Sequence, residues 1–192
     1  MDIKFLQAFL NEGQLTQAEL DAVIPKFKQV EFKRNEFLAN AGKTANDYWV
    51  LESGFIRSYV FDADGDEITT NFYSAGDVVI DWVSFLQRRP AREYIQALKD
   101  CICWQLDFDS FQTLFNTVEP FREQCRGRLV NGYFTLKERS ISMITDQAKD
   151  RYARLLKDKP DIFQNASLKN IATFLGVTDT SLSRIRKEIV AG

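Results

Sequence analysis

Histidine is absent from all 192 residues of the chain. Its absence excludes nucleophiles activated by an imidazole, zinc or haem held through histidine, and proton transfer by imidazole near neutral pH. The sequence also contains no GxxxxGK(S/T), GxGxxG or GxSxG motif, so the common phosphate-binding, dinucleotide-binding and hydrolase signatures are missing. We therefore expect that the protein is not an enzyme.

Cysteine is scarce: the chain has 3, with no CxxC pair and no N-terminal cluster. Cys101 and Cys103 are two residues apart in the strand-like run CICWQLDF, so both side chains lie on one face of that strand. Small apolar core residues are the simplest interpretation of this pair. We expect no bound iron–sulfur cluster or haem and no metal site. Unpaired thiols in a chain without a secretion signal indicate the cytoplasm.

Long apolar runs are lacking as well. No stretch approaches the roughly 18 apolar residues that a membrane span needs. The start, MDIKFLQAFLNEG, has no apolar h-region and no cleavage site, so we expect no signal peptide. Apolar residues make up 45% of the chain and charged residues 27%, which is typical of globular proteins. The composition predicts a cytoplasmic protein with no membrane partner.

One pair of acids could be mistaken for a catalytic dyad. Asp107 and Asp109 flank Phe108 at the end of a strand-like run. Acids at such a position more often accept hydrogen bonds from the first N–H groups of a following helix. We interpret the pair as a helix N-cap signal.

Charge is unevenly distributed along the chain. Residues 1–125 carry 12 basic and 20 acidic side chains, a net charge of −8. Residues 126–192 carry 13 basic and 7 acidic side chains, a net charge of +6. Such an asymmetry indicates that the C-terminal part meets a polyanion.

The spacing of apolar residues changes along the chain. Residues 3–28 show three-to-four spacing, and Thr16 with Glu19 matches a capping box, which predicts helical structure. From about 29 to 108, short alternating runs separated by turn residues predict strands. The DADG turn, which contains Gly65, indicates a hairpin between FIRSYVF and EITTNFY. These patterns predict an antiparallel β barrel or sandwich entered through an N-terminal helix.

Helical spacing returns after Asp109. SFQTLFNTVEPF predicts a short helix, and FREQCRGRLVNGYFTLKERSISMIT predicts a long one that ends at about residue 145. Two interpretations of the long helix stay open: it lies on its own barrel, or it pairs with a second copy of the chain. The second is favoured because apolar or small residues recur at steps of three or four, at positions 121, 125, 129, 133, 136, 140 and 143.

A compact segment of three predicted helices begins at Asp146. The first predicted helix is the amphipathic run QAKDRYARLLKDKP, and it is followed by a connector, DIFQNAS. The second helix is LKNIATFL, with Ser167 as its N-cap, and the last helix has Thr178 as its N-cap. The last two helices match a helix–turn–helix, whose steep crossing needs apolar faces, a small residue at the crossing and a turn glycine. These requirements are met by Ile171, Ala172, Leu175, Gly176, Val177, Leu182 and Ile185.

The polar face of the last helix predicts contacts with double-stranded DNA. In a helix–turn–helix the second helix enters the major groove, and arginine can bind guanine through two hydrogen bonds. There are two alternatives. The face is an ordinary solvated one, or it contacts protein as part of a ligand-binding or scaffolding module. The predicted base-reading residues are Asp179, Thr180, Ser183 and Arg184, and the predicted phosphate contacts are Thr178, Ser181, Arg186 and Lys187.

The order of these parts resembles the CRP/FNR transcription regulators, and the tail from residue 151 to 189 is similar to a branch common in Bacteroidetes. The resemblance implies an α+β fold with three parts: a β-roll sensor of the cyclic-nucleotide-binding jelly-roll type (1–117), a dimerisation helix (118–145) and a winged-helix-like helix–turn–helix domain (146–192). It also implies a homodimer on a palindromic DNA site and RNA polymerase as a partner. Little room is left after the last helix for the wing that relatives often add.

The resemblance also implies where a cyclic nucleotide would bind. The family's phosphate cassette resembles G-E-x-G followed by R-S/T-A, whereas this chain has GDVVIDWVSFLQRRPAREYIQAL. Ile80 stands where the first glycine belongs, and the acids Asp81 and Glu93 would repel a phosphate. The sequence therefore argues against cyclic AMP as the ligand. Two alternatives stay open: the protein binds no small ligand, or it binds a different one. The pocket residues for a different ligand would be Asp81, Trp82, Arg92 and Tyr94.

Overall fold

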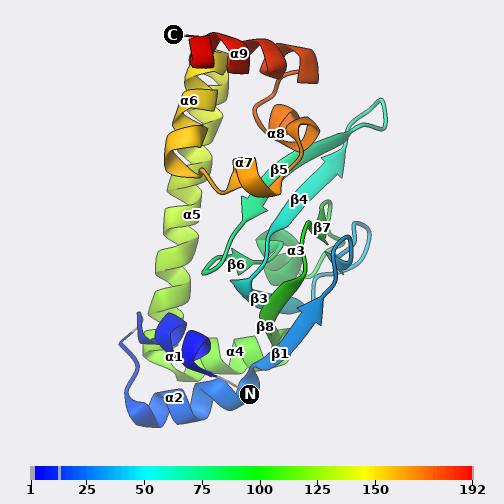
Figure 1. Cartoon of the computed structure of the whole chain (residues 1–192). Coiled ribbons are helices and arrows are strands. Elements are labelled where there is room, and N and C mark those ends of the chain that lie inside the picture. The colour runs from blue at the N-terminus through cyan, green and yellow to red at the C-terminus, as the bar shows by residue number, and fades with distance from the viewer. Residues whose placement is uncertain (1–2, 13, 192) are drawn as a thin grey trace.

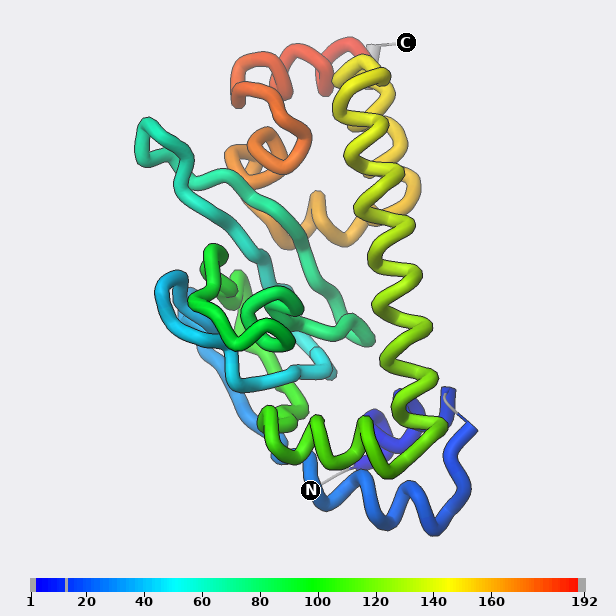
Figure 2. The backbone as a smooth tube through the Cα atoms, turned by 180° about the vertical axis from the view of Figure 1, so that it is seen from behind, coloured from blue at the N-terminus to red at the C-terminus, as the bar shows by residue number. Residues whose placement is uncertain are grey.

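The computed structural model describes residues 3–12 and 14–191, with side chains to Ile189. A long helix, α5 (Glu119–Thr145), runs along one side of the molecule with the strands beside it (Figure 1). The N-terminal helices lie near the start of α5, and the last helix lies across its far end. The view from behind in Figure 2 shows the same arrangement, with the two ends of the chain at opposite ends of the molecule.

The N-terminal helices are shorter than the sequence pattern indicated. They are α1 (Lys4–Asn11), α2 (Gln17–Val23) and the 3-10 turn η1 (Ile24–Lys26). The predicted capping box at the start of α2 is confirmed, because the Glu19 backbone N–H donates to Thr16 Oγ1 and the Thr16 backbone N–H donates to the Glu19 carboxylate. The buried faces of α1 and α2 pack into the largest apolar cluster of the molecule.

Within the described residues, the strands form two antiparallel sheets, ordered β1-β8-β3-β6 and β2-β7-β4-β5. These strands and the loops between them are called the roll (residues 28–107) below. The predicted antiparallel architecture is confirmed. The strands are β1 (Lys28–Phe32), β2 (Phe37–Ala39), β3 (Asp47–Ser53), β4 (Ile56–Phe61), β5 (Glu67–Tyr73), β6 (Val78–Val79), β7 (Tyr94–Ala97) and β8 (Cys101–Asp107).

The predicted hairpin joins β4 to β5. Gly65 has a φ of +85°, a backbone conformation that glycine adopts at no steric cost. The Asp62 carboxylate accepts the backbone N–H groups of Asp64 at 3.0 Å and Asp66 at 2.9 Å. The turn is therefore fixed by its own residues, and it presents several carboxylates at one tip of the roll.

Two further predictions about the roll are confirmed. Cys101 and Cys103 are buried in the core on β8, and neither forms a disulfide. Asp107 caps α4 (Phe108–Thr117), since its carboxylate accepts the backbone N–H of Ser110 at 2.9 Å. This hydrogen bond holds the pKa of Asp107 below its ordinary value. The carboxylate has a structural role at the helix start.

The structure contains two short helices that periodicity did not reveal. One is α3 (Trp82–Gln87), which begins at Asp81 and ends at Arg88 in a left-handed conformation. The other is α7 (Ile162–Asn165), in the run that the sequence suggested was a connector. Helices of four to six residues span fewer than two turns, so they leave no repeating pattern to detect.

The remaining helices form what is called the C-terminal segment (residues 146–191) below. They are α6 (Ala148–Asp158), α8 (Leu168–Phe174) and α9 (Asp179–Ala191), with α7 between α6 and α8. The segment packs around Ile171, Leu182 and Ile185, all of which are buried. This cluster also contains Phe55 and Phe72 of the roll. The core of the C-terminal segment is thus shared with the roll.

The long helix α5 changes character along its length. Phe121 and Cys125 are buried in the core that α4 and the roll also line. Beyond them, Tyr133 is 60% exposed and Leu136 is 63% exposed. Within the described residues, no helix combines the length and the apolar content that crossing a lipid bilayer requires.

Candidate nucleic-acid interface

The helix–turn–helix is formed by α8, a tight turn and α9. Ser167 caps α8, because its hydroxyl accepts the backbone N–H of Asn170 at 3.2 Å. Gly176 has a φ of +68°, and the next N–H, that of Val177, donates to the Ala172 carbonyl at 3.0 Å. The predicted caps and turn are therefore present in the structure.

A second constraint acts on the turn glycine. A Cβ added to Gly176 would lie 2.4 Å from Cε of Met143 on α5. The flexible methionine could move aside, but the positive φ would still strain any other residue. The turn is thus held against the end of α5, and this places α9 across that end of the molecule (Figure 1).

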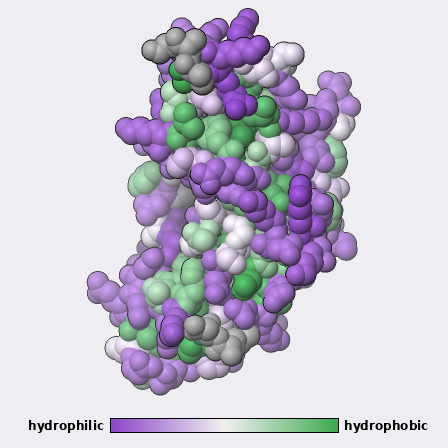
Figure 3. Space-filling view, viewed as in Figure 1, coloured by the Kyte–Doolittle hydropathy of each residue, from purple (hydrophilic) through white to green (hydrophobic). Residues whose placement is uncertain are grey.

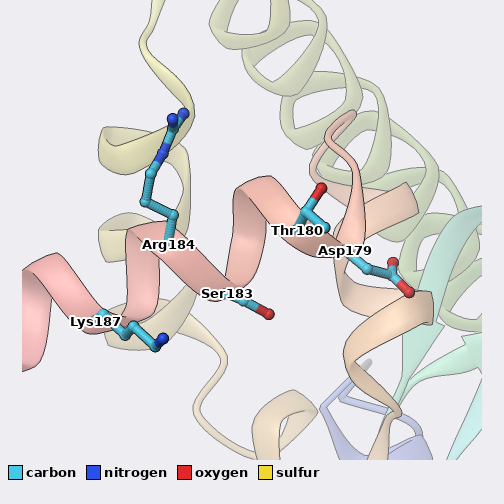
Figure 4. Close-up of a pocket in the computed structure, with 5 residues that line it drawn as sticks. All are labelled: Asp179, Thr180, Ser183, Arg184 and Lys187. Atoms are coloured by element: carbon cyan, nitrogen blue, oxygen red, sulfur yellow. The ribbon is translucent and has the colours of Figure 1, made fainter.

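The exposed face of α9 carries five residues that line a shallow surface hollow. Figure 4 shows them along one stretch of the helix, with Arg184 and Lys187 pointing in different directions. Positions 179, 183 and 187 follow one another at steps of four, as do positions 180 and 184, so they form two neighbouring rows along the exposed side of the helix. They are Asp179, Thr180, Ser183, Arg184 and Lys187.

The structure groups the eight predicted DNA contacts differently from the sequence interpretation. Lys187, which had been assigned to phosphate, lies in the same hollow as the four predicted base-reading residues. Thr178 is engaged at the start of the helix, since its hydroxyl accepts the backbone N–H of Ser181 at 3.3 Å. Arg186 is exposed outside the hollow. Helical periodicity of 3.6 residues explains why positions 183 and 187 share a face.

The cations of α9 are available to an anionic partner. Across the described residues, Arg184, Arg186 and Lys187 form no ion pair, whereas several other arginines of the chain do. Side chains that keep their charge without an internal partner can contact phosphate oxygens or base edges. The arrangement therefore suits double-stranded nucleic acid.

Asp146 joins the C-terminal segment to α5 through a network that sequence reasoning missed. Its carboxylate accepts hydrogen bonds from Ser142 at 2.7 Å, Thr145 at 2.9 Å and Arg154 at 2.7 Å. These donors hold the pKa of Asp146 below its ordinary value. Arg151 adds two hydrogen bonds to the Leu175 carbonyl. The junction fastens α6 to the end of α5, and through Arg151 it also fastens the end of α8.

The candidate ligand pocket is not assembled as the sequence suggested. Asp81 caps α3, where its carboxylate accepts the Ser84 backbone N–H at 2.9 Å. Trp82 packs edge-on against Tyr48 and Phe111, with ring centroids 6.1 and 6.3 Å away. The stretch that would hold a cyclic phosphate is therefore the start of a helix whose first residue, Trp82, packs against two aromatic rings.

The other two pocket candidates are Arg92 and Tyr94. Tyr94 stacks on Tyr59 with centroids 5.2 Å apart, in a separate ring cluster that includes Phe61, and Arg92 is exposed. Glu93 is partly buried, and this burial, with the repulsion of Asp81, raises its pKa. Glu93 immediately precedes β7, so the acid that interacts with Asp81 lies one position before the predicted tyrosine. Among the described residues, no cluster of acids and cysteines is placed to hold a metal ion.

Comparisons with known proteins match this architecture. Residues 29–118 match the family model of the cyclic nucleotide-binding domain. The fumarate and nitrate reduction regulatory protein of Yersinia pestis is 28% identical over 189 residues, which cover 92% of this chain and 72% of that protein. FixK2 from Bradyrhizobium japonicum has a TM-score of 0.74 at 15% identity over 86% of this chain and 85% of its own. A CooA mutant from Carboxydothermus hydrogenoformans also has a TM-score of 0.74, at 18% identity over 95% and 84%.

Proposed function

We propose that the chain is a transcription regulator of the CRP/FNR type, like the relatives it is similar to, and that it binds a palindromic site in double-stranded DNA as a homodimer. The observation that carries this proposal is the exposed face of α9, which presents hydroxyls and unpaired cations beyond the turn at Gly176. Such a face reads base edges when its helix enters the major groove. The relatives are regulators, and no enzymatic role is proposed.

The residues of α9 have distinct roles in this proposal. Arg184 donates two hydrogen bonds to a guanine, while Asp179, Thr180 and Ser183 contact neighbouring bases. Lys187 shares their hollow and contacts the groove or a phosphate at its edge. The phosphate backbone, which carries no sequence information, is met by Thr178, Ser181 and Arg186.

The dimer forms through the middle of α5. Its apolar side chains there are exposed in a single chain, and Figure 3 shows apolar side chains at the surface on the side of the molecule where α5 runs. Pairing two such helices buries them together. The exposed apolar residues of α5 are Leu129, Val130, Tyr133, Phe134, Leu136, Ile141, Met143 and Ile144.

The oligomeric state is tested by sedimentation of a charged variant. Leu136→Asp places a carboxylate in the proposed seam, and we expect the dimer to dissociate at concentrations at which the parent chain stays paired. Leu86→Asp is the matched control, because Leu86 is 50% exposed on α3, away from α5. Equal sedimentation of both variants as dimers would contradict pairing through α5.

We propose that the regulator responds to something other than cyclic AMP or to no small ligand. Ile80 is buried where a close backbone approach to phosphate would be needed. Asp81 and the partly buried Glu93 place negative charge in the same region, which disfavours an anionic ligand. A different ligand near Trp82 remains the alternative within this proposal.

The setting follows from the family. We place the protein in the cytoplasm, with RNA polymerase as a further partner. The three-part division assigns sensing to residues 1–117, dimerisation to residues 118–145 and DNA binding to residues 146–192.

The deciding experiment is selection of bound fragments from sheared genomic DNA at near-physiological salt, with and without cyclic AMP. We expect a palindrome with half-sites about ten base pairs apart, enriched equally in both conditions. Enrichment only with cyclic AMP would contradict the ligand proposal. Absence of enrichment, with a partner protein retained independently of salt, would favour the scaffolding role over DNA binding.

A further inference from the structure

The β4–β5 hairpin of the roll lies against α8, the first helix of the helix–turn–helix. Figures 1 and 2 both show the hairpin reaching from the body of the roll to this helix. The contact joins a strand of the sensor directly to the DNA-binding element. Three sets of interactions hold it, one from β4, one from α5 and one from β5, and an ion pair at the hairpin tip adds to them.

The first set is centred on Arg57 of β4, which is only 5% exposed. Its guanidinium donates to Asn170 Oδ1 on α8 at 3.0 Å and to Gln96 Oε1 on β7 at 3.0 Å, and it forms an ion pair with Glu67 on β5. Glu67 and Gln96 belong to the roll. When α8 moves away, Arg57 therefore keeps its counter-charge and loses only a neutral acceptor, so this contact can open without leaving a buried charge unpaired.

The second set is centred on Arg139 of α5. It donates to the Thr70 carbonyl of β5 and, at 3.0 Å, to the Phe174 carbonyl of α8. Its guanidinium carbon lies 3.9 Å from the centroid of the Phe174 ring. One side chain thus ties the long helix, the edge of the roll and the helix–turn–helix together.

The third set lies along β5. The Thr69 backbone N–H donates to Thr173 Oγ1 of α8 at 3.1 Å, and the ring of Phe72 packs on Phe174 with centroids 5.2 Å apart. Strand β5 is at the edge of its sheet, paired only with β4 among the described strands. Docking of α8 therefore satisfies an edge N–H that would otherwise face water.

The charge of the hairpin tip conflicts with DNA binding in this docked position. Asp66 forms an ion pair with Lys169 of α8 at 3.6 Å, and Asp62 and Asp64 lie in the same turn. In a helix–turn–helix complex the first helix crosses the DNA backbone. The tip thus holds carboxylates beside a helix that phosphates must approach, and it engages a lysine suited to contact them.

We propose that the β4–β5 hairpin is an autoinhibitory latch: docked on α8 it lowers the affinity of the protein for DNA, and its release is the step that permits tight binding. The proposal rests on the DNA-binding function proposed above. Asn170 and Thr173 act as latch residues on α8, where Asn170 accepts from Arg57 and Thr173 accepts from the Thr69 backbone N–H. Arg139 of α5 supports the same docking through the Phe174 carbonyl.

Two variants test the latch in the full-length dimer, with the selected palindrome as probe. Asn170→Ala removes one latch contact without changing charge, and we expect DNA affinity to rise about two- to tenfold, the range that corresponds to losing one hydrogen bond. Gln164→Ala, an exposed amide of α7 in the same segment, is the control. Asp66→Asn should strengthen binding more than Asp158→Asn, an exposed acid of α6 with the same charge change.

The rate of amide hydrogen exchange at Thr69 reports whether the hairpin is docked on α8. We expect its N–H to be protected in the free protein and to exchange faster in Asn170→Ala and in the complex with DNA. Unchanged or weaker DNA binding by Asn170→Ala, or a Thr69 amide that stays protected in the complex, would overturn the latch while leaving DNA binding intact. Failure of the parent chain and of every variant to retain DNA would instead overturn the proposed function, and the latch with it.

Discussion

The roll and the C-terminal segment form their apolar cores in different ways. The roll buries Val50, Ile95 and Leu106 completely, within clusters built from its own strands and the adjacent helices. The C-terminal segment has short helices, and its cluster takes in Phe55 and Phe72 from the roll. A segment of this size gains too little from its own apolar surface to be independent of its neighbour. Its position is therefore sensitive to the roll.

The two regions also differ in charge. Acidic side chains predominate in residues 1–125 and basic ones in residues 126–192. At the border, opposite charges meet, as in the ion pair of Lys169 with Asp66. The basic charge that suits the C-terminal segment to DNA also attracts this segment to the acidic roll. This comparison can be tested by changes confined to one region or the other.

Phe72→Ala should have the largest effect, because it removes a roll side chain that completes the other region's core. We expect a loss of about 3–5 kcal/mol in the free energy of unfolding, the usual cost of truncating a buried phenylalanine. All 3 tryptophans lie in the roll at positions 49, 82 and 104. Urea unfolding followed by circular dichroism should thus begin before unfolding followed by tryptophan fluorescence. A loss below about 1 kcal/mol would contradict the shared core.

Arg184→Ala tests the C-terminal segment alone. We expect a loss of about 1–3 kcal/mol in DNA binding and relaxed base preference at one position of each half-site. Lys187→Ala is the companion variant. If it contacts phosphate, binding weakens alike on all sequences and the salt slope falls by about one; if it reads the groove, preference changes as well. Binding titrations on a set of substituted sites distinguish the two, and unaltered preference in Arg184→Ala would contradict its assignment.

Thr16→Ala tests the opposite end of the molecule. It removes the hydroxyl that caps α2, and we expect a loss of about 0.5–2 kcal/mol in stability. DNA affinity should stay unchanged, because the cap lies far from α9 (Figure 1). Thr16→Ser retains the hydroxyl and is the control. Thermal unfolding and DNA titration of both variants provide the measurements, and equal stability of the two variants would exclude a role for the cap.

Glu93→Gln should give the smallest effect, at the border of the roll and α5. Burial raises the pKa of Glu93 above its ordinary 4.5, so its ionisation opposes folding. The stability associated with the protonated form is fully present below about pH 4.5 and is lost as the pH rises through the raised pKa. Glu93→Gln should therefore unfold at a higher temperature than the parent chain at pH 7, and the difference should shrink toward pH 4. A difference that is independent of pH would contradict this account.

Most of the local structure could be predicted from the sequence. The capping box at Thr16, the hairpin turn at Gly65 and the cap at Ser167 each depend on residues within about four positions. The helix–turn–helix frame was visible for the same reason, because apolar residues and a turn glycine recur at fixed offsets. The short helices α3 and α7 were missed because they have too few turns to create a period.

The candidate sites were predictable to different degrees. The polar face of α9 follows from helical spacing alone, although the hollow takes in Lys187 beside the expected readers. The candidate ligand pocket depends on contacts between segments that are distant in the sequence. Glu93, just before β7, is the side chain that interacts with Asp81, and no local pattern could reveal this.

The sequence by itself determined the elements other than the short helices α3 and α7, together with the caps and turns described above, the polar face of α9 and the separation of charge, because each of these arises from neighbouring residues or from composition. Only the tertiary structure decided how the regions meet. Arg57 reaches Asn170 across 113 positions of the chain, and Arg139 reaches Thr70 across 69. Such pairs form only when distant segments are brought together by the burial of apolar surface, and they determine where the DNA-binding helices lie.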